Sequence, residues 1–211
     1  MPIPSPQDVA SMMVEAPGAS RYRVKGLAYL GHLDYCERFL PQGKAGFLAA
    51  LTPDLRRFFE QDFLPADWYD IFPLAAAGFV CAEQLGLTFD AFVRQRAAFQ
   101  ASEDVKGVYR VFFLVLSTRS IATKLPRLLF QYFSFGDIAI LTSESHRVVA
   151  QRLGIPALLL SWQSAAAQGY LEVILKLAGA KDPEITFGDP VPAGKVGVHE
   201  LVDATMAVTW R

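Results

Sequence analysis

The sequence lacks the short motifs that usually identify an enzyme or a metal protein. Its 211 residues contain no HExxH, CxxC or HxH pattern for a metal, no GxSxG for a serine nucleophile, and neither GxGxxG nor GxxxxGK[ST] for a phosphate. The histidines His32, His146 and His199 are expected to be structural or surface residues, without a His or Cys partner at ligand spacing. We therefore expect no catalytic or metal-ligating residues, and a non-catalytic protein is favoured over an enzyme.

Cysteine is scarce, and neither sign of charge dominates. Cys36 and Cys81 stand outside any known thiol motif, so buried reduced thiols and a cytoplasmic location are expected. The 20 basic and 21 acidic residues give a net charge of −1, which provides no positive field to attract nucleic acid. The N-terminus lacks the pattern of a signal peptide. The most apolar run, VFFLVL (111–116), is far shorter than the roughly 20 residues of a membrane span. We expect neither a nucleic-acid nor a membrane partner.

Aromatic side chains are what the sequence has in excess. Sixteen Phe, seven Tyr and three Trp stand in a chain that is 52% apolar. Most of these rings are expected to fill a large core, because aromatic residues are major core fillers. The alternative is that some of them line a ligand pocket or a protein interface.

The first two-thirds of the chain is predicted to be helical, after an irregular Pro/Ser/Gly-rich tail at residues 1–21. Apolar residues recur at helical spacing over 24–36, 43–51, 53–61, 74–85, from Thr88 to Ala97, 104–123 and 125–133. Gly86 is a predicted C-terminal cap and Thr88 a predicted N-terminal cap. Pro65 is expected to open a helical turn that carries Trp68 and Tyr69.

Two features of this helical part leave alternatives open. Gly26 and Gly31 weaken the first helix, and they could instead mark a turn before it or a close helix crossing. Near the aromatic turn, Asp67, Asp70 and Glu83 are expected to cap helices or to be solvated.

The last third of the chain predicts alternating strands and helices. Strands are expected at 136–141, 157–162, 183–190 and 204–210, and helices at 142–154 and 164–177. The predicted fold class is α+β: a helical N-terminal part followed by a β-α-β-α-β-β unit that forms a small, mainly antiparallel four-stranded sheet. No segment resembles a linker, so residues 22–211 are expected to form one domain.

The predicted apolar helix at 104–123 is interrupted by a short polar segment. Residues 116–120 read LSTRS, and a buried Arg119 would require an anionic partner from the protein or from a ligand. The alternative is that the helix reaches the surface there.

Several segments resemble an uncharacterised family with many paralogues in myxobacteria. They are RVKGLAYL (23–30), FLPADWYDIFP (63–73), YFSFGDIAI (132–140) and the long segment at 154–190 that begins GIPALLLSWQS, and the resemblance covers about residues 22–211. This family has no assigned activity, so the resemblance implies no catalytic residues.

The order of elements is also distantly similar to haem-dependent nitric oxide/oxygen-binding domains and to 4-vinyl reductase-type domains. This similarity implies a sensory or ligand-binding module. The neighbourhood of the first group's proximal histidine is LSTRSIATK (116–124) here, without a histidine. That group's Tyr-x-Ser-x-Arg signature is matched by Trp162 and Ser164, with Ala166 at the arginine position. The zinc-holding late cysteines of the second group have no counterpart after Cys81. No cofactor is therefore predicted, and haem is not expected.

The leading hypothesis is a non-catalytic sensory module that binds an apolar or amphipathic small molecule between the helical part and the sheet. The candidate ligand-binding residues are Phe112, Phe113, Leu116, Arg119, Phe130, Trp162 and Tyr170. The alternative hypothesis is a protein–protein interaction module of a signalling system, including a homodimer. A third is a haem or metal sensor that uses His32 or His146.

Overall fold

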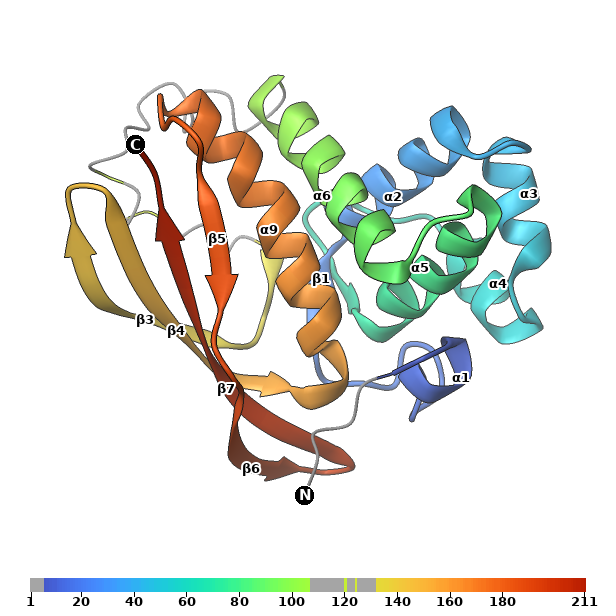
Figure 1. Cartoon of the computed structure of the whole chain (residues 1–211). Coiled ribbons are helices and arrows are strands. Elements are labelled where there is room, and N and C mark those ends of the chain that lie inside the picture. Colours follow the sequence, from blue (N-terminus) through green and yellow to red (C-terminus); the bar gives the residue numbers. More distant parts are fainter. Residues whose placement is uncertain (1–5, 107–119, 121–123, 125–131) are drawn as a thin grey trace.

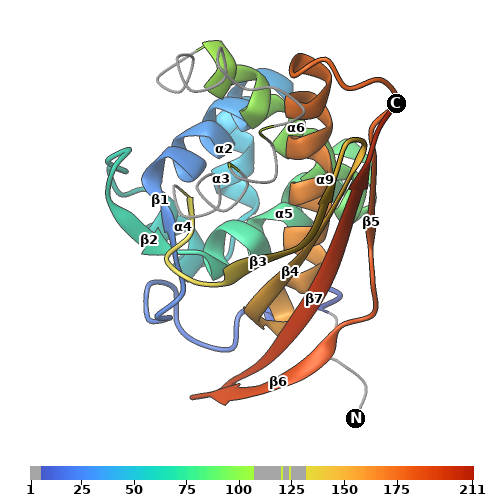
Figure 2. The same cartoon turned by 90° about the vertical axis from the view of Figure 1, so that its left-hand side faces the viewer.

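A helical part and an antiparallel sheet pack together, with one long helix between them (Figure 1). The computed structural model describes residues 6–106, 120, 124 and 132–211. The same arrangement is seen from the side in Figure 2, where the long helix α9 lies against the inner face of the curved sheet. The predicted α+β fold class is confirmed at this level.

The helices of the N-terminal part follow the predicted pattern closely. They are α1 (Val9–Met12), α2 (Gly26–Phe39), α3 (Gly43–Ala50), α4 (Pro53–Phe59), α5 (Phe72–Leu85) and α6 (Phe89–Lys106). Gly86 ends α5 in the left-handed conformation, with φ of +63°, which a glycine adopts without strain. At the start of α6, the Ala91 amide donates a hydrogen bond to Thr88 Oγ1 at 3.3 Å. Both predicted caps are confirmed. The predicted helices at 104–123 and 125–133 lie almost entirely outside the described residues.

The predicted helical turn at Trp68 and Tyr69 is wrong. Strand β2 (Trp68–Asp70) pairs antiparallel with β1 (Arg23–Lys25), with Val24 opposite Tyr69. Long-range pairing overrides the local preference of Pro65 for a helix start.

Both alternatives left open for Gly26 and Gly31 occur together. Gly26 is the first residue of α2, directly after β1, and a Cβ atom there would lie 2.1 Å from the Leu64 carbonyl oxygen. A Cβ atom at Gly31 would lie 2.0 Å from Gln100 Oε1 of α6. One glycine therefore permits the strand-to-helix turn, and the other permits close contact between α2 and α6.

The sheet is larger than predicted and differently connected. Its strands β3 (Asp137–Glu144), β4 (Arg147–Pro156), β7 (His199–Thr209) and β5 (Glu184–Phe187) lie in that order, and β6 (Val191–Val196) pairs with another part of β7. All these pairs are antiparallel. The mainly antiparallel prediction is thus confirmed, but the described residues form a sheet of five strands, not four.

Two elements of the last third are assigned wrongly by the sequence pattern. The predicted helix at 142–154 is mostly β4, and the predicted strand at 157–162 is a short 3-10 turn (Ala157–Leu159) followed by the start of α9 (Leu160–Leu177). In β4 the residues Val148, Ala150 and Arg152 alternate inward, and this two-residue period indicates a strand. In α9 the buried Trp162, Ala165 and Gly169 follow the helical period instead.

Helix α9 connects the two halves of the molecule. It packs along α6 on one side, and its Leu171 and Leu175 join the buried residues of the sheet on the other. At the crossing with α6, a Cβ atom at Gly169 would lie 2.0 Å from the Arg94 carbonyl oxygen. The two helix backbones therefore touch where residue 169 has no side chain.

The N-terminal segment is held against the rest of the structure. Met12 of α1 is fully buried, and the Gly18 and Ser20 amides donate to Asp70 Oδ2 at 3.0 and 3.1 Å. Glu15 Oε2 lies 2.6 Å from Nε2 of the buried His199. Asp70 thus acts as a backbone cap, and residues 12–20 make specific contacts where an irregular tail is predicted. The single-domain boundary at residue 22 stays a prediction.

Among the described helices, no single one combines the length and hydropathy of a membrane span. Only α5 and α6 taken together reach both, and they meet at an angle of 104°.

Candidate functional site

A largely apolar cavity of about 120 Å³ lies where the helical part, α9 and the sheet meet. Its walls include residues of β1, α2, α5, α6, β4, α9 and β7. The aromatic wall residues that the structure describes are Phe92, Tyr132, Phe133, Trp162 and Tyr170, and the polar ones include His32, Arg96, Gln100, Arg152 and Gln163. The cavity is therefore between the two halves of the fold, as the leading hypothesis expects.

Two of the predicted ligand-binding residues line this cavity. Trp162 and Tyr170 are both in its wall and both belong to α9. The other five, Phe112, Phe113, Leu116, Arg119 and Phe130, lie outside the described residues.

A buried arginine in the cavity wall has no counter-ion among the described residues. Arg152 follows Val148 and Ala150 on the inward face of β4 and is only 6% exposed. Its Nε and Nη2 atoms find no hydrogen-bond partner in the part of the chain that the structure describes. Burial lowers the pKa of its guanidinium to about 10, because the charged form is poorly solvated there. An isolated buried cation is costly and commonly has a functional explanation.

A second buried polar group of the wall is also unpaired. Both the oxygen and the nitrogen of the Gln163 side-chain amide lack a hydrogen-bond partner in the described structure, and Gln163 is 2% exposed. An amide can accept from a ligand through its oxygen and donate through its nitrogen. Arg152 and Gln163 together give this apolar cavity two unused polar contacts.

The opposite wall contains a hydrogen-bond network, in which Arg96 Nε is the buried atom without a partner in the described structure. Arg96, Gln100 and Asp104 lie one turn apart on α6, where Arg96 Nη2 donates to Gln100 Oε1 at 3.0 Å and Gln100 Nε2 donates to Asp104 Oδ1 at 2.7 Å. The Tyr170 hydroxyl donates to Asp104 Oδ2 at 2.8 Å, and the Tyr132 hydroxyl donates to the same oxygen. Arg96 also donates to the Ala28 carbonyl oxygen at 2.5 Å. This network fixes Tyr170 and the α6–α9 pair, and it leaves Arg152 without a counter-ion.

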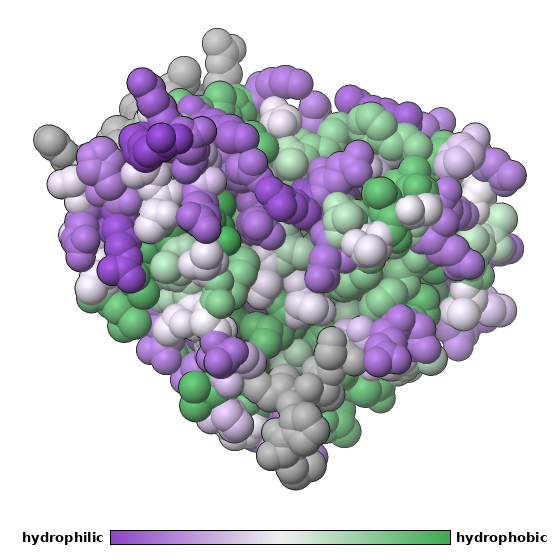
Figure 3. Space-filling model, viewed as in Figure 1, coloured by the Kyte–Doolittle hydropathy of each residue, from purple (hydrophilic) through white to green (hydrophobic). Residues whose placement is uncertain are grey.

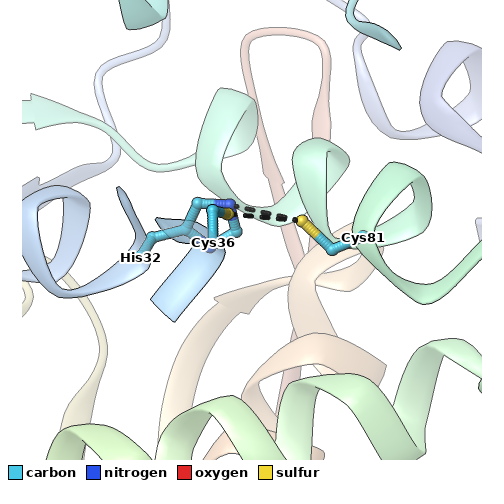
Figure 4. Close-up of side chains that lie close together, drawn as sticks. All are labelled: His32, Cys36 and Cys81. Carbon is cyan, nitrogen blue, oxygen red and sulfur yellow. Dashed lines mark hydrogen bonds between the residues drawn. The ribbon is translucent and has the colours of Figure 1, made fainter. Parts of the chain in front are cut away.

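Three metal-binding side chains meet beside the cavity. His32 and Cys36 of α2 face Cys81 of α5 (Figure 4), and all three are almost fully buried. Cys81 Sγ lies 3.7 Å from His32 Nε2 and 3.7 Å from Cys36 Sγ. The hydrogen bond from the Cys81 thiol lowers the pKa of Cys36 to about 5, and sharing that bond while buried raises the pKa of Cys81. Since His32 is also in the cavity wall, the cluster and the cavity share a side chain.

The sequence-based expectation that His32 has no cysteine partner is wrong. Positions 32 and 36 are one helical turn apart and lie on the same face of α2. The spacing of His32 and Cys36 was a sequence signal for a shared site. The proximity of Cys81 to them follows only from the packing of α5 on α2. The other two histidines are elsewhere: His199 pairs with Glu15, and His146 is exposed near the Trp210 ring.

Two further wall residues were missed by the sequence analysis. Arg152 becomes conspicuous once β4 is read as a strand, because it interrupts an inward apolar row. Tyr132 had a signal as well, since Tyr132 and Ser134 reproduce the Tyr-x-Ser spacing that was assigned to Trp162 and Ser164.

Comparison of the sequence with known families gives no match. No family model matches the chain, and no curated protein matches its sequence.

The fold does match solved structures of H-NOX proteins. The Fe(II) unliganded H-NOX protein from K. algicida has 8% identity and a TM-score of 0.65, over 89% of this chain and 96% of that one. An H-NOX protein from S. oneidensis in the Fe(II)NO state has 12% identity and a TM-score of 0.59, over 89% and 99%. An oxygen-binding H-NOX domain related to soluble guanylate cyclases has 8% identity and a TM-score of 0.58, over 88% and 89%. The chain therefore has the H-NOX fold, and the expected distant similarity to this group is confirmed for the architecture.

The prediction that no cofactor binds, with haem specifically not expected, is contradicted by these neighbours. It depended on a missing histidine in the segment 116–124, most of which lies outside the described residues, and on Ala166 at the arginine position of the Tyr-x-Ser-x-Arg signature. Solved structures that share the fold include an Fe(II) and an oxygen-binding H-NOX protein. Missing motif residues were too narrow a basis for excluding a cofactor from a cavity with other candidate contacts.

Proposed function

We propose that this protein is a sensory module that binds an amphipathic carboxylate, with the apolar body in the cavity and the carboxylate on Arg152. The observation that carries the proposal is the buried guanidinium without a counter-ion. Arginine and carboxylate pair through two parallel hydrogen bonds, which would use the free Nε and Nη2 atoms of Arg152. A ligand of this charge would neutralise Arg152, whereas a neutral apolar ligand would leave that guanidinium without a counter-ion.

The apolar walls of the cavity suit a small ligand body. Phe92, Phe133, Trp162 and Met206 surround the space with rings and a flexible thioether. Its volume of about 120 Å³ is similar to that of an engineered apolar cavity of roughly 150 Å³ that binds benzene. A longer body requires the walls to move apart, since sites for larger ligands occupy about 300 Å³ or more.

Haem belongs to the same ligand class, because it joins an apolar ring system to carboxylates. In this cavity Arg152 would hold a carboxylate and His32 would be the imidazole available to the iron. When bound, haem supplies an iron that takes up diatomic gases. The residues fit the group chemically, and the described cavity must widen to admit it.

The proposal is tested by comparing two probes that have the same number of carbon atoms but a charged or a neutral head group. Calorimetric titration of the full chain with hexanoate and with 1-hexanol should show at least roughly tenfold tighter binding of the carboxylate, as one charge-assisted pair is worth about 1.5–3 kcal/mol. Arg152→Met should remove this preference. The control Arg147→Met, on an exposed position of the same strand, should keep it. Equal affinity for both probes in the unchanged protein overturns the proposal.

A haem titration distinguishes between haem and another carboxylate as the ligand of Arg152. If haem is the ligand, added haemin should give an absorbance band in the Soret region that His32→Ala shifts and Arg152→Met weakens. If hexanoate selectivity is present without such a band, the ligand is a carboxylate other than haem.

The remaining sequence-based hypotheses stay predictions. These are the homodimer or signalling partner, the cytoplasmic location and membership of the myxobacterial family. On the face shown in Figure 3, polar and apolar residues are interspersed, without one continuous apolar surface. The large aromatic residues Tyr29, Phe47, Phe59 and Phe92 are buried in the core, which favours core filling over an interface for these rings.

A further inference from the structure

We propose that His32, Cys36 and Cys81 form a binding site for a thiophilic metal ion, with Zn²⁺ as the ion that fits best. The ligand atoms of the three residues all lie within 4.8 Å of one another. The carboxylate contact at Arg152 involves none of these three residues, and the inference does not depend on it. His32 is shared with haem binding as proposed above, so a metal ion in this cluster and a haem iron would compete for its imidazole.

The distances within the cluster match those around a tetrahedral zinc ion. Two thiolate sulfurs at 2.3 Å from such an ion are about 3.8 Å apart, and a sulfur and an imidazole nitrogen are about 3.6 Å apart. In the cluster, Cys81 Sγ lies 3.7 Å from Cys36 Sγ and 3.7 Å from His32 Nε2, and all three ligand atoms lie within 4.8 Å of one another. An ion could therefore be bound with small side-chain movements.

The three ligands are presented by well-packed helices. His32 and Cys36 lie one turn apart on α2, so the helix itself sets their separation. Cys81 comes from the middle of α5, which is buried along most of its length. Ligands on rigid elements have little conformational entropy to lose when an ion binds.

The surroundings of the cluster favour a neutral complex. Rings of Phe47, Phe59 and Phe92 surround the His32 ring, with centroids 5.2, 5.9 and 6.2 Å away. A low-dielectric site of this kind penalises net charge. A divalent ion with two thiolates and a neutral imidazole has no net charge, whereas a monovalent ion would leave one negative charge.

The described residues supply three ligands and no fourth. Cys₂His sites with one open position are known for zinc, where water or a small molecule completes the tetrahedron. Of the three ligands, His32 also lines the cavity. Thiolate-rich sites bind soft ions in preference to Mg²⁺ or Ca²⁺.

Cobalt titration tests the site directly, because the chain contains only two cysteines. Full-length protein, kept reduced by a phosphine, should bind one Co²⁺ per chain and develop a thiolate-to-cobalt charge-transfer band. Added Zn²⁺ should abolish that band by displacing the cobalt. Cys36→Ser, Cys81→Ser and His32→Ala should each lose the band, and the exposed-histidine control His146→Ala should retain it.

Circular dichroism of every variant shows whether it is folded. If one cysteine variant does not fold, the band of the unchanged protein decides, since any thiolate band must come from Cys36 or Cys81. The absence of a charge-transfer band in the unchanged protein overturns the proposal. A band that survives in folded Cys36→Ser and Cys81→Ser, or a disulfide that persists in phosphine, overturns it as well.

Discussion

Arg152 carries a charged side chain at an inward-facing position of β4, where an apolar residue is expected. Val148 and Ala150 before it on β4 are 2% and 0% exposed, and Arg152 is 6% exposed. Lowering the pKa of this guanidinium to about 10 corresponds to roughly 3 kcal/mol, at about 1.4 kcal/mol per unit. The unfolded chain holds this proton more tightly, so the destabilisation is fully present below pH 10, and it is relieved progressively as the pH rises from that value to the ordinary pKa of arginine. At neutral pH the free protein therefore contains a destabilising charge.

Replacing this arginine should stabilise the protein while it removes ligand selectivity. We expect Arg152→Met to raise the free energy of unfolding by about 1–3 kcal/mol, because a flexible apolar side chain of similar length removes an unpaired buried charge. Urea unfolding of the free protein measures this change. Arg147→Met at an exposed site should stay within about 0.5 kcal/mol of the unchanged protein. A destabilised Arg152→Met would show that Arg152 is paired within the protein, contrary to our interpretation.

The wrong predictions of a helix at 142–154 and of a strand at 157–162 have the same physical origin. Val148, Val149 and Leu153 fit a helical period over a short window, and the same residues also fit a strand. Pairing with β3 and β7 decides between the two, since each residue of β4 from Arg147 to Arg152 has a partner on both sides. In the same way, Leu158–Leu160 is compatible with a strand by composition, and only the continuation of the buried face to Leu175 makes the segment a helix.

The contact between α6 and α9 depends on the absence of a side chain at Gly169. In a free helix, Gly→Ala stabilises by about 1 kcal/mol. Here the new Cβ atom would lie 2.0 Å from a backbone oxygen of Arg94, so the helices must separate. We expect Gly169→Ala to destabilise the protein by about 2 kcal/mol or more. This change in stability is opposite in sign to the one that helix propensity alone predicts.

Thermal and urea unfolding of Gly169→Ala measure this effect, with Gln168→Ala on the same helix as the matched control. The control should change stability by less than about 0.5 kcal/mol. If Gly169→Ala were as stable as the unchanged protein or more stable, the close crossing of α6 and α9 would not exist in solution.

In the whole molecule, two of the described contacts between the helical part and the sheet stand out. One is α9, which packs on both, and the other is the N-terminal segment. Met12 is buried against the helical part, and Glu15 pairs with His199 at the start of β7. Figure 1 shows α1 below the helical part, near the end of the sheet where β6 and β7 pair. The cavity lies between these two halves, so both contacts support its walls.

Removing the N-terminal segment should therefore weaken the whole fold. Deletion of residues 1–17 removes the fully buried Met12 and leaves the 4%-exposed His199 without Glu15. Loss of a buried methionine costs about 2–5 kcal/mol, and an unpaired buried polar group costs about 1–3 kcal/mol. We expect a loss of about 3 kcal/mol or more in urea unfolding.

A shorter deletion provides the control. Removal of residues 1–5 keeps the buried Pro6 and keeps Asp8, whose side chain accepts from the Ser11 amide at 2.8 Å and caps α1. This variant should retain nearly full stability. Equal stability of the longer deletion would show that residues 8–17 are not docked, as the sequence-based description of an irregular tail implies.

The sequence by itself determined the features that local physics controls. The helices from residue 26 to 106, with the glycine cap at Gly86 and the hydroxyl cap at Thr88, follow from periodicity and capping. The α+β class, the antiparallel sheet, and Trp162 and Tyr170 as residues of the cavity wall were also predictable. Each depends on residues that are close in the chain or on a fold-level pattern.

The tertiary structure alone decided the features that depend on contacts between residues far apart in the sequence. It converts 147–156 into a strand and 160–177 into a helix, since pairing and burial override short-range periodicity. It places Cys81 beside His32 and Cys36, and it leaves Arg152 buried without a counter-ion among the described residues. Residue spacing in the sequence gives information about one helix or one strand at a time, and not about contacts between elements. The sequence could therefore show neither the buried arginine nor the complete set of metal-binding side chains.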